Sequence, residues 1–400
     1  MGKKELQNRL SDYIDQHLEE YKEIALEIHQ RPETSNHEYF ACGRLSQKLK
    51  DEGFEVKTDV AGHPTGFDAR IKSSKGPTIA FLAEYDALEG LGHGCGHNLF
   101  GATSILAGIA LKQILTETGG EIRVYGTPGE EGGENGSAKG SFVREGYFKD
   151  VDAALCVHPG DCHGLTSTAL ANDPVDIEFF GKSSHAASAP EQGINALEAL
   201  ILVYNGINAL RQHLPSDVRI NGVILNGGTA ANIIPDYTKA RFYLRAATRK
   251  TLDIVYTKVE NIVKGAALQT GTTYKFGLFQ NSVDNVIPTP LFDEIYRKHL
   301  EEAGETITIR NGSGSTDVGN VSQVIPVIHP HIKISDTPIA GHSLEFKAAA
   351  CSPQGLESIG LGAKLMAYCA LDLLLEEGLL EKIKLQHKEE VAKQYGRENP

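Results

Sequence analysis

The sequence lacks several features that would assign it to a membrane or to nucleic acid. It has no run of 18 consecutive apolar residues, the length that a bilayer-spanning helix requires, so we expect no membrane span. It also lacks an excess of basic residues. The 39 Lys and Arg residues face 52 Asp and Glu residues, and the resulting net charge of -13 argues against binding to nucleic acid or to an anionic membrane surface. No internal repeat and no low-complexity segment is evident.

Targeting signals are missing as well. The N-terminus has no apolar signal core, and Leu6 stands where N-myristoylation requires Ser or Thr. Six scattered cysteines without a secretory signal indicate reduced thiols, so we expect a cytoplasmic protein. At 400 residues, with 40% hydrophobic and 23% charged residues, the chain can bury ample core and is expected to form two domains.

Hydrophobic periodicity predicts an α/β domain with a mixed sheet flanked by helices, formed by residues 1–172 and 285–400. Its predicted elements in the first part are helices at 6–28, 38–52 and 98–115 and strands at 54–60, 67–72, 78–84, 121–126 and 153–157. After residue 285 we expect helices at 290–303 and 352–377, a glycine- and serine-rich loop at 311–320, a strand near 323–328, and a solvated helix or tail over the last twenty residues.

The pattern changes between residues 173 and 284. Predicted strands and helices follow one another there as β-α-β-β-α-β, the order of a ferredoxin-like unit. Within residues 240–246 apolar and polar side chains alternate, as a sheet with one covered face requires. We therefore expect an inserted α+β domain over residues 173–284.

The stretch at residues 92–98, GHGCGHN, places one thiol and two imidazoles at alternate positions among glycines. These are ligands for a divalent transition metal, and the H-x-C-x-H spacing requires a looped backbone. A helix is predicted to follow, and its positive end would favour a thiolate at Cys95. Three other interpretations stay open: a structural zinc site, a nucleophilic Cys95 with a histidine base, and a glycine-rich turn with chance histidines.

Further candidate ligands follow predicted strands. The strand at 78–84 ends in Glu84, with Asp86 close behind, and the next strand is followed by Glu130 and Glu131. His158 closes the strand after that. Because open α/β sheets build their sites at the carboxyl ends of the strands, we expect these side chains to meet at one edge.

These motifs carry a resemblance over nearly the whole chain. GHGCGHN, PGEEGG, VHPG, GKSSHAA, GGTAANIIPD and AGHS occur in this order. Together they resemble the aminoacylase, carboxypeptidase-G and amidohydrolase family of metallopeptidases (clan MH). Cys95 is typical of the subgroup of hippurate and indole-acetyl-amino-acid hydrolases. CGHNLFG with residues 314–319, GSTDVG, looks closer still to the p-aminobenzoyl-glutamate hydrolase and β-alanyl-dipeptidase branch.

The resemblance implies a zinc-peptidase-like catalytic domain with two divalent metal ions per subunit, zinc first and manganese or cobalt as alternatives. It also implies that the inserted domain is a lid that forms homodimers or higher homo-oligomers. By motif position the metal ligands would be Cys95, His97, Glu131, His158 and His342. Glu130 would be the general base, His185 a lid residue that stabilises the oxyanion and Asp86 an acceptor behind His97. Asn232, Arg245 and Gly341 would contact the substrate.

Two positions depart from the family pattern: Glu84 stands where relatives have Asp or His, and Asn98 where the subgroup mostly has Asp. The expected reaction is hydrolysis of an amide bond in N-acyl amino acids, aminobenzoyl amino acids or small peptides, by a metal-activated water. A cysteine hydrolase using Cys95, and a non-catalytic binding subunit of a heteromeric hydrolase, are the alternatives. The sequence leaves the acyl group, the released amino acid and the physiological metal open.

Overall fold

The computed structural model describes residues 2–309, 312 and 314–396. The chain divides into two compact units, Met1–Thr168 with Val286–Pro400, and Ala169–Asn285. Sequence periodicity predicts boundaries close to these, at 173 and 284.

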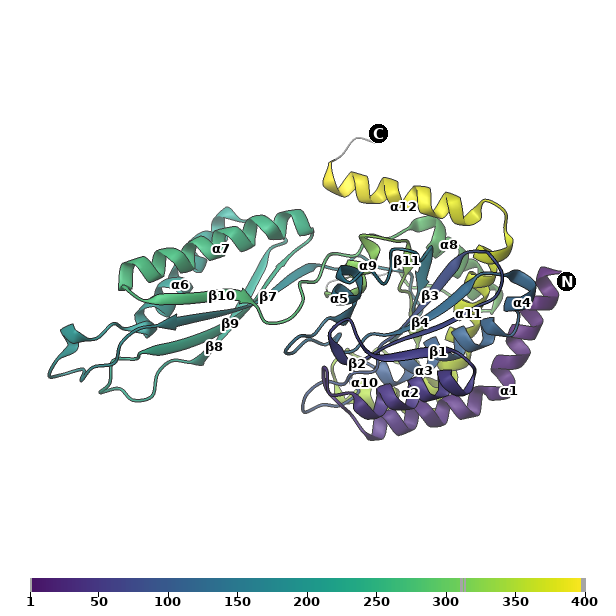
Figure 1. Ribbon diagram of the computed structural model, residues 1–400, viewed down its shortest axis with the longest axis horizontal. Helices are drawn as coiled ribbons and strands as arrows, with labels where there is room; N and C mark the ends of the chain where they lie inside the picture. Colours follow the sequence, from purple (N-terminus) through teal and green to yellow (C-terminus); the bar gives the residue numbers. More distant parts are fainter. Residues whose placement is uncertain (1, 310–311, 313, 397–400) are drawn as a thin grey trace. The chain divides into compact units, whose positions relative to one another are not determined.

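The first unit is built on a six-stranded mixed sheet (Figure 1) with the strand order β1-β2-β4-β3-β5-β11. β4, β3, β5 and β11 pair in parallel, whereas β2 pairs antiparallel with both β1 and β4. The strands are β1 (Glu55–Val60), β2 (His63–Lys72), β3 (Thr78–Ala83), β4 (Glu121–Gly126), β5 (Ala153–Leu155) and β11 (Val327–Ile328). The carboxyl ends of the parallel strands therefore meet at one edge.

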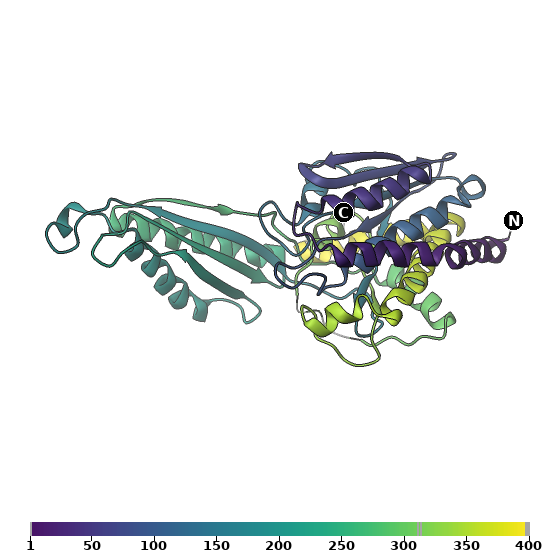
Figure 2. The same ribbon diagram turned by 90° about the horizontal axis from the view of Figure 1, so that it is seen from below.

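Helices cover both faces of this sheet (Figure 2). β3 is buried along its whole length: Ile79, Phe81 and Ala83 belong to the main core, and Ala80 and Leu82 to a second cluster. The main core includes residues of α1 (Lys3–Gln30), α2 (Tyr39–Asp51), α3 (His97–Lys112), α4 (Leu115–Thr118), α8 (Pro290–Glu302), α10 (Leu344–Ala349) and α11 (Pro353–Leu375). The second cluster includes residues of α5 (Ala138–Arg144) and α9 (Val318–Ser322).

α11 is long and apolar enough to cross a membrane, judged by length and composition. Its most apolar 18-residue window has a mean hydropathy of 1.5, and 72% of that window is buried inside the protein. This is the burial of a core helix.

Two predicted strands differ from the structure. His158 does not close β5, which ends at Leu155; it begins β6 (His158–Gly160), which pairs in parallel with β12 (His331–Lys333). The strand expected near 323–328 is reduced to β11, because the preceding residues form the turn of α9 and its continuation. Of the loop expected at 311–320, residues 311 and 313 lie outside the described residues.

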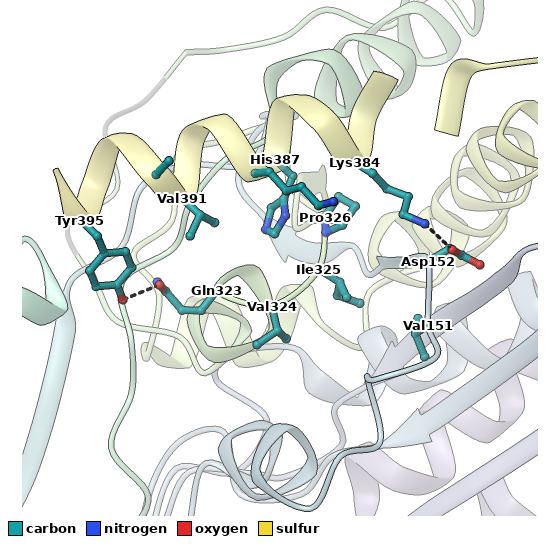
Figure 3. Close-up of a pocket in the computed structure, with 12 residues that line it drawn as sticks. Val151, Asp152, Gln323, Val324, Ile325, Pro326, Lys384, His387, Val391 and Tyr395 are labelled. Carbon is teal, nitrogen blue, oxygen red and sulfur yellow. Dashed lines mark hydrogen bonds and ion pairs between the residues drawn. The ribbon is translucent and has the colours of Figure 1, made fainter. Parts of the chain in front are cut away.

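The C-terminal helix α12 (Leu379–Tyr395) is attached to the first unit, whereas its composition predicts a solvated helix or tail. Ile383 and His387 are buried, and His387 donates from Nε2 to the carbonyl oxygen of Ser322 at 2.7 Å. Lys384 pairs with Asp152 at 2.8 Å. Between this helix and the segments at 151–152 and 323–326 lies a pocket of about 290 Å³ (Figure 3).

The second unit is a four-stranded antiparallel sheet with the order β10-β7-β9-β8. Its strands are β7 (Ala171–Phe180), β8 (Arg219–Asn226), β9 (Tyr237–Ala246) and β10 (Thr273–Leu278), and its helices are α6 (Ala196–Leu210) and α7 (Arg249–Thr270), with 3-10 turns at Pro190–Gln192 and Arg211–His213. Burial alternates along β9, because one face packs against the helices. This is the ferredoxin-like arrangement that the sequence predicts.

Candidate metal centre

Two expected ligands come from the glycine-rich loop before α3. Cys95 lies in the loop and His97 is the first residue of the helix. Between them Gly96 has a φ of 77°, in the left-handed region that favours glycine. A Cβ at Gly96 would stand 3.0 Å from Pro159 and 3.2 Å from Phe346. The glycine therefore allows the sharp turn that brings the thiol and the imidazole to one centre.

The candidate ligands form two groups that share Cys95. The ligand atoms of Cys95, His97 and His158 all lie within 4.8 Å of one another, and so do those of Cys95, Glu131 and His342. Sγ of Cys95 is 3.4 Å from Nε2 of His158, and Nε2 of His342 is 3.3 Å from Oε2 of Glu131. One ligand shared between two groups is an arrangement suited to two neighbouring ions.

Hydrogen bonds orient both imidazoles toward this centre. His97 donates from Nδ1 to Oδ1 of Asp86 at 3.0 Å, and the other oxygen of Asp86 accepts the backbone N–H of Glu131 at 2.9 Å. His158 donates from Nδ1 to the carbonyl oxygen of Pro159 at 2.6 Å. Because each Nδ1 donates this hydrogen bond, each ring directs Nε2 toward the centre, where its lone pair can bind a metal once the ring is neutral. In the metal-free chain, against the effect of burial, Cys95 and Asp86 raise the pKa of His97 well above its usual value.

The donor set fits divalent transition metals. Oε1 of Glu131 is buried without a hydrogen-bond partner in the described part of the chain, which is costly unless a cation satisfies it. Thiolate, imidazole and carboxylate together suit zinc, cobalt or manganese. The centre also gathers several carboxyl groups, two of which, those of Glu84 and Asp317, pair with the ammonium of Lys139. The carboxyl groups that gather there are Glu84, Asp86, Glu130, Glu131 and Asp317.

Burial and neighbouring charges shift the pKa values of these groups. Burial, then the carboxylates of Glu84 and Glu131, raise the pKa of Glu130 well above its usual value. Burial and the charge of His97 lower the pKa of His158 to about 4, which keeps it neutral. Burial and the charge of Glu131 raise the pKa of Cys95 well above its usual value. In the metal-free chain burial and Glu131 thus oppose the Cys95 thiolate that the helix N-terminus is expected to favour.

Sequence reasoning missed the contacts that hold the loop carrying Glu130. On one side the buried carboxylate of Glu38 accepts the backbone N–H of Gly129 at 2.9 Å. On the other side Lys139, wholly buried at the start of α5, contacts Asp317 at 2.6 Å. These partners lie 91 and 178 positions apart in the sequence, so no local pattern could have paired them.

Two residues near the ligands stay outside the two groups. His93, the other imidazole of the loop, is buried and stacks on His29 with ring centroids 5.9 Å apart. Burial and the charge of His97 lower its pKa to about 3. Gly341 is exposed with open space around it, and its neighbour His342 adopts a φ of 58°.

The other expected substrate-contacting residues lie in the second unit. The segments of His185 and Asn232 are paired, because the backbone N–H of Ala186 donates to the carbonyl oxygen of Asn232 at 3.1 Å. Arg245 is half-buried on β9, and its guanidinium lies 4.8 Å from the ring centroid of Tyr243.

Comparison with known proteins places the chain in a family. Residues 174–271 match the peptidase dimerisation domain of M20 proteins. The chain is 33% identical to the Xaa-Arg dipeptidase of Mus musculus, over 96% of this chain and 92% of that protein. It is 31% identical to one of the subunits of the p-aminobenzoyl-glutamate hydrolase of Escherichia coli, over 96% and 95% of the two chains.

Solved structures share the fold. An aminobenzoyl-glutamate utilization protein from Klebsiella pneumoniae superposes with a TM-score of 0.68 at 18% identity, over 91% of this chain and 98% of that one. A dinuclear metal-binding peptidase of the M20 family from Bacillus subtilis gives a TM-score of 0.64 at 19% identity, over 90% and 99%. This chain belongs to the M20 family of peptidases and amidohydrolases, which cleave amide bonds, and lies near its p-aminobenzoyl-glutamate hydrolase branch.

Proposed function

We propose that the protein hydrolyses the amide bond of N-acyl amino acids, aminobenzoyl amino acids or short peptides with two divalent ions, zinc first and manganese or cobalt as alternatives. Cys95, His97 and His158 would hold one ion, and Cys95, Glu131 and His342 the other. The observation that carries this proposal is the pair of ligand groups sharing the sulfur of Cys95.

Two ions bound there would supply a nucleophilic water at neutral pH and polarise the substrate carbonyl. Glu130 would take the proton from the attacking water and deliver it to the leaving amine, a role usually worth about 10²–10⁴ in rate. Its raised pKa suits a group that must hold a proton between these two steps. Asp86 would keep His97 oriented through the hydrogen bond at Nδ1.

The second unit would act as a lid and as the dimerisation surface. Nδ1 of His185 accepts the backbone N–H groups of Ala187 and Ser188 at 3.2 and 3.1 Å, which leaves the proton on Nε2. His185 would therefore have a proton to donate to the oxyanion of the tetrahedral intermediate when the lid closes. Asn232 and Arg245 would bind the substrate, Arg245 its carboxylate. We also propose a cytoplasmic location, in keeping with six free cysteines.

The relatives narrow the substrates to be tested. One relative is named for dipeptides that end in arginine and another for aminobenzoyl-glutamate, so the released amino acids carry opposite charges. Protein reloaded with zinc, manganese or cobalt should be incubated with a panel of Xaa-Arg dipeptides, p-aminobenzoyl-glutamate and N-acetyl amino acids, and the products identified by mass. We expect cleavage of at least one class, loss of turnover with EDTA, and recovery on adding metal.

Two outcomes would contradict the proposal. Full activity in excess chelator, with inactivation by alkylation of Cys95, would favour a cysteine hydrolase. A protein that binds both ions and the substrates but releases no product would favour the non-catalytic subunit.

A further inference from the structure

A third group of ligand atoms lies beside the two that share Cys95. The carboxylates of Glu84 and Glu130 and the imidazole of His97 bring ligand atoms within 4.8 Å of one another. Nε2 of His97 is 3.2 Å from Oε2 of Glu84, while the other ring nitrogen is committed to a hydrogen bond. One imidazole nitrogen binds one ion. The third group therefore competes with Cys95 and His158 for the same ion.

An ion in the third group would disable the proposed chemistry. It would coordinate Glu130, and a coordinated carboxylate cannot accept the proton of the attacking water. The third group can bind the same divalent metals as the group of Cys95, His97 and His158, because two carboxylates and an imidazole form an acceptable donor set for them. Something must therefore keep the third group free.

Lys139 is placed to do this. Its side chain is wholly buried, and Nζ lies 2.7 Å from Oε1 of Glu84 and 2.6 Å from Oδ1 of Asp317. Asp317 also accepts the backbone N–H of Lys139 at 3.0 Å, which fixes the start of α5. The ammonium ion therefore compensates the charge of Glu84 at the carboxylate oxygen that does not face His97, and repels a second cation.

We propose that Lys139 is a positioning residue that keeps the ion out of the group formed by Glu84, His97 and Glu130, and so leaves Glu130 free to act as the base. Asp317 holds the ammonium in place. This inference rests on the proposed two-metal function. It adds that Lys139 determines which group of ligands one of the two ions occupies.

The test uses cobalt as the probe, since a cobalt-thiolate bond gives a near-ultraviolet charge-transfer band that reports on Cys95. The variant is Lys139→Met/Asp317→Asn, which removes the ammonium and one of its two carboxylates together, so that less uncompensated charge is buried than in Lys139→Met alone. In the proposed site the sulfur of Cys95 would bind both cobalt ions. If one ion shifts into the group of Glu84, His97 and Glu130, one of the two cobalt–thiolate bonds is lost, and the band should fall by about half at unchanged cobalt stoichiometry. kcat should fall with little change in KM, since Glu130 becomes a ligand.

Adding Glu84→Gln to this double variant removes the competing carboxylate and should restore the band. Glu84→Gln alone should leave the band of the wild-type protein unchanged. A wild-type band in the double variant, or a reduced band that Glu84→Gln does not restore in a folded protein, would overturn the role of Lys139. A wild-type protein that binds no cobalt would instead overturn the proposed function.

Discussion

Replacing Asn98 by Asp, the residue that the family subgroup mostly carries, should destabilise this protein. The side chain of Asn98 is wholly buried, and its amide nitrogen donates to the carbonyl oxygens of Ala25 at 3.2 Å and Ala350 at 3.0 Å. It thereby ties α1 to the turn between α10 and α11. An aspartate removes both donors and faces two carbonyl oxygens with a carboxylate.

The structure sets the size of this effect. Each buried carbonyl left without its donor costs about 1–3 kcal/mol, so Asn98→Asp should lose roughly 2–6 kcal/mol, a large part of the stability of a typical domain. The new carboxyl would have a folded-state pKa above its unfolded value of about 3.9, because burial disfavours its charge. A group with a raised folded-state pKa loses its contribution as pH rises through that pKa, so the loss should be larger at pH 8 than at pH 5.

Urea denaturation of the metal-free protein, followed by circular dichroism at both pH values, measures this effect. Asn98→Ala is the matched control, because it removes the same donors without adding a charge, and its loss should not depend on pH. An Asn98→Asp variant with a free energy of unfolding within about 0.5 kcal/mol of the wild type, the ordinary range for changes away from such contacts, would contradict this prediction. Equal losses in the free energy of unfolding for Asn98→Asp and Asn98→Ala at both pH values would contradict the predicted effect of the added charge.

The remaining predictions concern the thiol and the lid. Cys95 should resist iodoacetamide in the metal-loaded protein and react after chelation, because coordination occupies its lone pairs; equal alkylation in both states would remove it from the ligand set. Metal binding should release a proton from Cys95, since its raised pKa keeps the thiol protonated in the metal-free chain, and calorimetry in buffers of different ionisation enthalpy measures this release. We expect His185 to serve the metal site of the partner subunit, so mixed dimers of His185→Ala and Glu130→Ala subunits should regain activity. In such a dimer the His185→Ala subunit supplies an intact Glu130 and its partner supplies an intact His185, so one site is complete. No recovery, with heterodimers confirmed by native mass spectrometry, would exclude that arrangement.

The sequence predicts the elements that depend on local periodicity. β3 shows why: six consecutive residues fit a strand buried on both faces, and all six are buried. The order of the second unit follows from the same reasoning, because apolar and polar side chains alternate along β9 and its helices carry one apolar face. The confirmed family membership follows from motifs that are themselves local, such as residues 92–98.

What the sequence does not show are contacts between distant segments. Lys139 and Asp317 meet across 178 positions, and a lysine in a short helix gives no sign that it is buried. The attachment of α12 escapes prediction because Lys, Glu and Gln dominate its composition, while the buried stripe is carried only by Leu380, Ile383 and His387. The position of Cys95 before a helix also does not show that burial and Glu131 raise the pKa of its thiol in the metal-free chain.

Two adjacent glutamates, Glu130 and Glu131, are proposed to act as base and as metal ligand, and metal content measured together with turnover distinguishes these roles. Glu130→Gln should retain both ions and lose at least about a hundredfold in kcat, because only the proton acceptor is removed. Glu131→Ala should bind less metal, because it removes a ligand that converges with Cys95 and His342. Depleted metal in Glu130→Gln with full metal in Glu131→Ala would contradict the assignment of base and ligand.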